Sequence, residues 1–125
     1  MGTLTETYIA AYNDFVEMAK DSEKMARESK YDFDKCLFLD SAIEEYETAQ
    51  EYLDKAYKDC DYKSIEFEKY TNGEWHSNMK INILTKIIGL TQDYYKYAKN
   101  IFERHSDEIS KLELSHELFK KLSGN

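Results

Sequence analysis

Apolar residues recur at alternating steps of three and four along three long stretches of the chain, which is the period of an amphipathic helix. The first stretch predicts a helix over residues 5–29. Thr3 and Thr5 stand at its start, and either hydroxyl suits an N-cap position. The inward row of this helix consists of Tyr8, Tyr12, Phe15, Ala19, Ser22 and Ala26.

A second helix is predicted over residues 34–61, with Asp32 or Asp34 available as its N-cap. Alanine recurs at every seventh residue along its apolar row, which lets a neighbouring helix approach closely. The apolar row consists of Leu39, Ala42, Tyr46, Ala49, Leu53, Ala56 and Cys60. The opposite face is acidic and carries Asp40, Glu44, Glu45, Glu47, Glu51 and Asp54.

The third stretch, residues 81–105, is the most apolar and carries two adjacent rows instead of one. The first row is Leu84, Ile88, Thr91, Tyr95, Ala98 and Phe102. The second row is Ile83, Ile87, Leu90, Tyr94, Tyr97 and Ile101. A helix with two apolar rows contacts at least two other helices, as the members of a helical bundle do.

A fourth, shorter helix is predicted over residues 107–122. Ser106 suits its N-cap, and the acidic residues Asp107 and Glu108 suit the positive end of a helix dipole. Gly124 follows the predicted last turn, where helices commonly end.

The helical pattern breaks over residues 62–80. Asn72-Gly73 within this segment predicts a β-hairpin. A helical turn ended by Gly73 and an irregular loop are the alternatives. The segment either presents its aromatic residues to a partner or caps the bundle and buries Trp75. Its apolar residues are Tyr62, Ile65, Phe67, Tyr70, Trp75 and Met79.

These elements predict an all-α fold, an antiparallel bundle of three long helices and a shorter C-terminal helix, in a single domain spanning residues 1–125. Proline is absent and glycine occurs only four times, which argues against a turn-rich β fold. We expect the core to contain Phe15, Ala19, Leu39, Ala42, Ala49, Leu53, Leu84, Ile88, Tyr95, Ala98 and Phe102.

The formal net charge of −8 is concentrated in the first half of the chain. Residues 1–60 contain 15 acidic and 7 basic residues, whereas residues 61–125 contain 10 of each. The basic surface that nucleic acids or anionic membranes would require is missing, so we expect neither partner. The sequence shows no signal peptide and no apolar run of about 18 residues, so a cytoplasmic location is expected.

Residues that could carry chemistry are few. A Glu-x-x-His pair occurs once, at Glu113 and His116, whereas di-iron bundles need two such pairs and further inward-facing Glu side chains. The apolar rows of the long helices offer no Glu, so no metal or other cofactor is expected. Cys36 and Cys60 on one continuous helix would lie too far apart for a disulfide, and Cys36, near the helix start, should be the more reactive thiol.

The sequence therefore favours a non-catalytic, acidic, tyrosine-rich protein that acts by protein–protein interaction. One concrete form is an inhibitor or immunity-type protein for a basic target. Partner-binding candidates are Tyr62, Phe67, Tyr70, Trp75 and Met79, with Asp40, Glu44, Glu47, Glu51 and Asp54 on the acidic face. The alternatives are a self-assembling structural helical oligomer and a bundle with an internal small-molecule or metal site.

Overall fold

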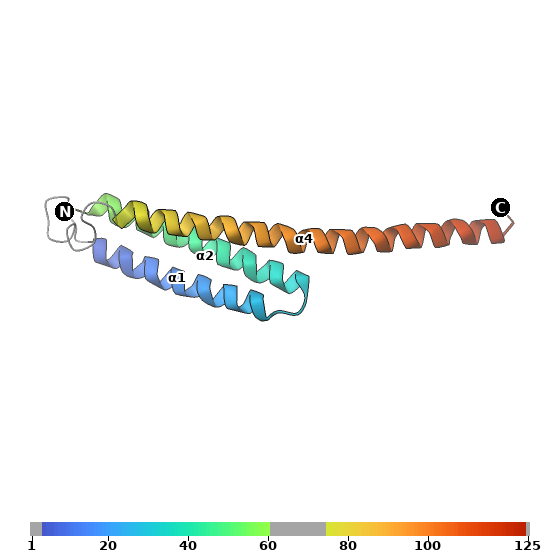
Figure 1. Ribbon diagram of the computed structural model, residues 1–125, viewed down its shortest axis with the longest axis horizontal. Coiled ribbons are helices and arrows are strands. Elements are labelled where there is room, and N and C mark those ends of the chain that lie inside the picture. Colours follow the sequence, from blue (N-terminus) through green and yellow to red (C-terminus); the bar gives the residue numbers. More distant parts are fainter. Residues whose placement is uncertain (1–3, 61–74, 125) are drawn as a thin grey trace.

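The computed structural model describes residues 4–60 and 75–124, and it is all-α, as the sequence predicts. Three helices are described: α1 (Thr5–Glu28), α2 (Asp32–Asp59) and α4 (Trp75–Leu122). Helices α1 and α2 form an antiparallel hairpin, and α4 lies along α2 and then continues far beyond the turn of that hairpin (Figure 1). The molecule is therefore elongated, with the C-terminus at the tip of the projecting part of α4.

The ends of α1 and α2 differ slightly from the prediction. The N-cap of α1 is Leu4 and not a threonine, because Thr5 turns inward and its hydroxyl donates to Asp59 Oδ2 over 2.9 Å. The same carboxylate oxygen accepts the Leu4 backbone N–H over 2.8 Å. The last turn of α2 therefore supplies the acceptor that the first turn of α1 needs. Helix α2 begins at Asp32, after an extended Tyr31.

The core lies along α2, which packs against both α1 and α4. The predicted alanine row is confirmed, since the alanines of α2 and two alanines of α1 are buried and allow close helix contact. Aromatic side chains of α1 pack against this core, and Phe15 stacks on Tyr52 of α2 with ring centroids 5.6 Å apart. The buried apolar residues of α1 and α2 include Tyr12, Ala19, Ala26, Leu39, Ala42, Tyr46, Ala49, Leu53 and Ala56.

The prediction of two helices over 81–105 and 107–122 is wrong, because α4 is one continuous helix of 48 residues. Ser106 is an interior residue of α4, and neither proline nor glycine lies between Gly89 and Gly124 to end the helix. Gly124, two residues after the last residue of α4, has φ of 81°, as predicted for a residue after a helix end.

The predicted β-hairpin at 62–80 is also not matched. Helix α4 begins at Trp75, so residues 75–80 are helical and Met79 packs against the core. The remainder of that prediction falls on residues outside the described ranges.

Only one of the two apolar rows of the third stretch belongs to the core. Ile83 and Leu90, from the second row, are buried against α2, and Ile87, Tyr94 and Tyr97 pack around them. The first row lies at the edge of the contact with α2, where Leu84 and Ala98 border α2 residues, and its large side chains are exposed. The core prediction is therefore wrong for Leu84, Ile88, Tyr95 and Phe102, which are exposed, and Ala98 is only partly buried.

Candidate functional site

A largely exposed and mainly apolar row runs along almost the whole of α4. We call it the α4 seam and define it as Ile81, Leu84, Ile88, Thr91, Tyr95, Ala98, Phe102, His105, Ile109, Leu112, His116 and Phe119. Its members follow one another at alternating steps of three and four, which is the heptad spacing of a coiled-coil interface. Tyr95 is 68% exposed and Phe102 is 71% exposed. Large exposed apolar side chains in one row are typical of an interaction surface.

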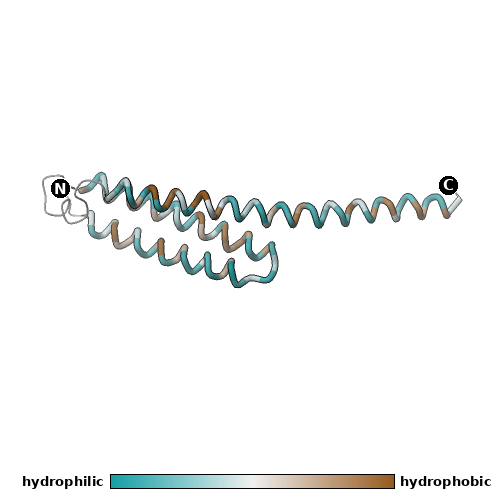
Figure 2. Tube along the Cα trace, viewed as in Figure 1, coloured by the Kyte–Doolittle hydropathy of each residue, from teal (hydrophilic) through white to brown (hydrophobic). Residues whose placement is uncertain are grey.

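The row that faces α2 becomes polar at the level of Asp32, where α2 begins. Ile101 is its last apolar member along the hairpin, and the next position is Arg104, whose Nη1 lies 3.2 Å from Oδ2 of Asp32, the first residue of α2. Further along α4 the corresponding positions are the polar Glu108, Lys111 and Ser115, followed by Leu118 and Leu122. The α4 seam does not stop at this point but continues to Phe119, and apolar residues recur along the projecting part of the helix (Figure 2).

The difference in length between the two rows identifies two separate contacts. The pattern facing α2 is apolar along the hairpin and polar at its four positions from Arg104 to Ser115, before Leu118 and Leu122 near the end of α4. The α4 seam is about 57 Å long, from residue 81 to residue 119 at a rise of about 1.5 Å per residue. Neither α1, with 24 residues, nor α2, with 28 residues, is long enough to cover the whole α4 seam.

The predicted acidic face of α2 borders the α4 seam. Asp40, Glu44, Glu47 and Glu51 are exposed, and none of them makes an ion pair with another described residue. Glu47 and Glu51 line a groove between α2 and α4 together with Gln50, Asp54, Leu84 and Ile87.

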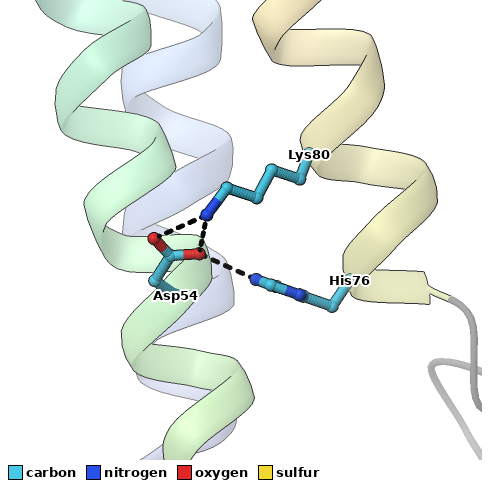
Figure 3. A network of polar contacts seen from close by, with 3 residues as sticks. All are labelled: Asp54, His76 and Lys80. Carbon is cyan, nitrogen blue, oxygen red and sulfur yellow. Dashed lines mark hydrogen bonds and ion pairs between the residues drawn. The ribbon is translucent and has the colours of Figure 1, made fainter.

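Asp54, the last of the predicted acidic residues, joins α2 to the first turns of α4 (Figure 3). Its Oδ1 lies 2.7 Å from Nε2 of His76, and Lys80 Nζ lies 3.1 Å from both carboxylate oxygens. The ring of Tyr57 stacks on the imidazole with centroids 4.2 Å apart. Partial burial raises the pKa of Asp54, but the hydrogen bonds from His76 and Lys80 outweigh it, so the pKa lies below its ordinary value.

A second polar contact was missed by the sequence reasoning. Glu23 of α1 is 7% exposed, contrary to the expectation that the long helices offer no inward Glu. Its Oε2 accepts a hydrogen bond from the Tyr46 hydroxyl over 2.5 Å, and its Oε1 lies 3.0 Å from Lys86 Nζ. One carboxylate thus connects all three helices. The signal was present in the sequence, since Glu23 stands four residues after Ala19 and three before Ala26.

The aromatic partner candidates of the 62–80 segment do not form an exposed cluster in the described part of the chain. Trp75 is only 5% exposed and packs edge-on against Tyr57, with ring centroids 6.1 Å apart. Met79 is half-buried beside it. For Trp75 the structure therefore matches the alternative in which this residue caps the bundle. Tyr62, Phe67 and Tyr70 lie outside the described residues.

Other candidate chemistry is limited to single groups. Within residues 4–60 and 75–124, no three His, Cys, Asp or Glu side chains are placed so that they could hold a metal ion. No helix in the same residues is long and apolar enough to cross a membrane. Both cysteines are thiols, and Cys36 is buried, contrary to its predicted accessibility.

Comparisons with protein-family models, curated proteins and solved structures found no match for this chain.

Proposed function

We propose that the protein is a non-catalytic helical assembly protein that acts by packing the α4 seam against a helix of another chain. The observation that carries this proposal is the length of the seam, which continues at heptad spacing through the projecting half of α4. Burying its side chains on association would be favourable, because each large apolar side chain removed from water contributes about 1.5–3 kcal/mol.

The buried and half-buried carboxylates hold the helices together, which supports a structural role for them. Glu23 links three helices, and Asp54 links α2 to α4 through His76 and Lys80. These contacts fix the position of the first half of α4 on the hairpin. The seam is therefore presented by a rigid support over residues 81–98, and it projects free of the hairpin beyond Arg104.

In-cell photo-crosslinking tests the proposal with two leucines that lie two residues apart and are nearly equally exposed. Leu112 lies on the α4 seam and is 70% exposed, whereas Leu114 lies on another face and is 69% exposed. A benzophenone amino acid at position 112 should give a discrete covalent adduct in cells that make the protein, and the same group at 114 should give none. Absence of an adduct at 112, or equal adducts at both positions, would contradict the proposal.

A second candidate function is inhibition of a basic target through the acidic face of α2. The supporting observation is that Asp40, Glu44, Glu47 and Glu51 are exposed and make no ion pair with other described residues. Such a row would accelerate encounter with a positively charged surface. A benzophenone group at Glu47 should then give an adduct that high salt suppresses, whereas an adduct at Leu112 should resist salt because it reports an apolar contact.

A further inference from the structure

We infer that the helix occupying the α4 seam is α4 of a second copy of this chain, in antiparallel orientation. The inference rests on the proposed function, and it adds the identity and direction of the partner. Its first support is length, because α4 with 48 residues is the only described helix that could cover the seam from residue 81 to residue 119.

The second support is the pairing of side chains along the seam. In an antiparallel coiled coil, an a position of one helix faces a d position of the partner helix. The register that covers the whole seam pairs residues whose numbers sum to 200. It pairs the small Ala98 with the large Phe102 of the second copy, and Thr91 with Ile109. The remaining pairs are Ile81 with Phe119, Leu84 with His116, Ile88 with Leu112 and Tyr95 with His105.

A parallel pair would bring each residue against its own copy. Ala98 would then face Ala98 and leave a gap, while Tyr95 and Phe102 on either side would each meet an identical large ring. Two histidines, His105 and His116, would also face their own copies across the interface. Close packing requires large residues opposite small ones, so the antiparallel register fits the sequence better.

The third support comes from α2. Phe33 and Leu37 are exposed at the start of α2, and they line an apolar hollow beside Ala98 and Ile101. These residues lie at the level of residue 100 of α4, which is the midpoint of the proposed pairing. Phe102 of the second copy would enter this hollow opposite Ala98. The two-fold axis would also bring the starts of the two α2 helices together, as an isologous interface requires.

The arrangement gives the projecting half of α4 a defined place. Residues 102–119 of each copy would lie along residues 81–98 of the other, where the seam is supported by the hairpin. Each end of the dimer would then contain α1, α2, the first half of α4 and the projecting half from the second copy. That is a four-helix arrangement in which the fourth helix comes from the partner chain.

The first experiment measures the mass of the purified full-length protein by light scattering, with Leu112→Lys and Leu114→Lys as a matched pair. Wild type and Leu114→Lys should have the mass of a dimer. Leu112→Lys should have the mass of a monomer, because it places a charge on the seam. Circular dichroism checks that both variants keep the helical hairpin. A wild-type monomer would overturn the inference, as would dissociation by both variants.

The second experiment determines the direction by disulfide formation. Chains carrying Leu84→Cys and chains carrying His116→Cys should cross-link efficiently when mixed and oxidised, because residues 84 and 116 face each other only in the antiparallel register. Each variant alone should cross-link as little as the wild type, which controls for Cys36 and Cys60. Efficient cross-linking of Leu84→Cys with itself would indicate a parallel pair and overturn the inference.

The two proposals can fail separately. A benzophenone adduct at position 112 that contains a different protein, together with a purified protein that is monomeric, would leave the proposed function standing and overturn the second copy as the partner. An adduct of twice the chain mass whose peptides all come from this chain is the result expected from both proposals. No adduct at 112 in cells would contradict the proposed function itself.

Discussion

The hydroxyl of Tyr46 donates a hydrogen bond to the buried carboxylate of Glu23 over 2.5 Å, and this contact joins α2 to α1 inside the core. Burial raises the pKa of Tyr46 above its ordinary range, and the hydrogen bond to Glu23 raises it further. The second partner of the Glu23 carboxylate is Lys86, and the Lys86 side chain is about half exposed. Because a buried charge needs its hydrogen bonds, this pair should contribute strongly to stability.

Tyr46→Phe should lower the free energy of unfolding by about 1.5–3 kcal/mol, the range for hydrogen bonds to charged groups. The ring remains, so the loss reports the hydroxyl and not the packing. Urea unfolding followed by circular dichroism measures the change. Tyr31→Phe is the matched control, because Tyr31 is exposed and its hydroxyl should matter by less than about 0.5 kcal/mol. Equal effects of the two substitutions would contradict this role of Glu23.

The sequence predicted the all-α class and the inward rows of α1 and α2, because those rows follow the helical period without ambiguity. It did not predict which row of α4 faces α2. Both rows have the same period, and the choice depends on tertiary contacts such as those of Trp75 with Tyr57 and of Arg104 with Asp32 at the two ends of α2. Periodicity alone cannot rank two equally apolar faces.

Two local signals were also outweighed by their context. Ser106 followed by acidic residues resembles a helix start, but serine is tolerated within a helix, and no residue nearby stops the helix from continuing. Glu23 was not expected among the inward residues, because charged residues are seldom buried without partners. Its partners, Tyr46 and Lys86, come from other helices, so they are visible only once the fold brings these helices together.

The alanine row of α2 predicts a sharp response to added volume. Ala49 is fully buried where α1 and α2 approach each other, so Ala49→Leu should cost about 1–3 kcal/mol by overfilling this contact. Ala10→Leu is the same substitution at an exposed position of α1, and it should change the stability by less than about 0.5 kcal/mol. Thermal unfolding of the two variants compares them directly. Equal destabilisation would show that the helix contact does not depend on small residues.

Cys36 should react slowly with thiol reagents in the native protein, which reverses the expectation drawn from its place near a helix start. Burial raises the pKa of its thiol, the carboxylate of Asp32 raises it further, and the sulfur lies 3.8 Å from the carbonyl oxygen of Tyr94. The thiolate is the reactive form, so both effects slow the reaction. Ellman's reagent should therefore modify Cys36 at a rate that rises steeply on adding denaturant. Complete modification within the mixing time in native buffer would contradict the burial of this thiol.

The contact of Asp54 with His76 and Lys80 makes a prediction about pH. The pKa of Asp54 is lowered in the folded protein, so its contribution to stability is fully present above the ordinary pKa of an unfolded Asp, about 3.9, and is lost as the pH falls through the lowered value. The carboxylate is about one-third exposed, so solvent screening limits the contribution to about 1 kcal/mol or less.

Asp54→Asn should accordingly lower the free energy of unfolding near pH 6 by up to about 1 kcal/mol, and the difference from wild type should shrink as the pH falls below about 4. Urea titrations at a series of pH values measure it. Asp40→Asn is the control, since Asp40 is exposed and makes no ion pair with other described residues. A difference for Asp54→Asn that persists unchanged at low pH would show that it arises from packing. Asp54 would then not act as a charged acceptor between α2 and α4.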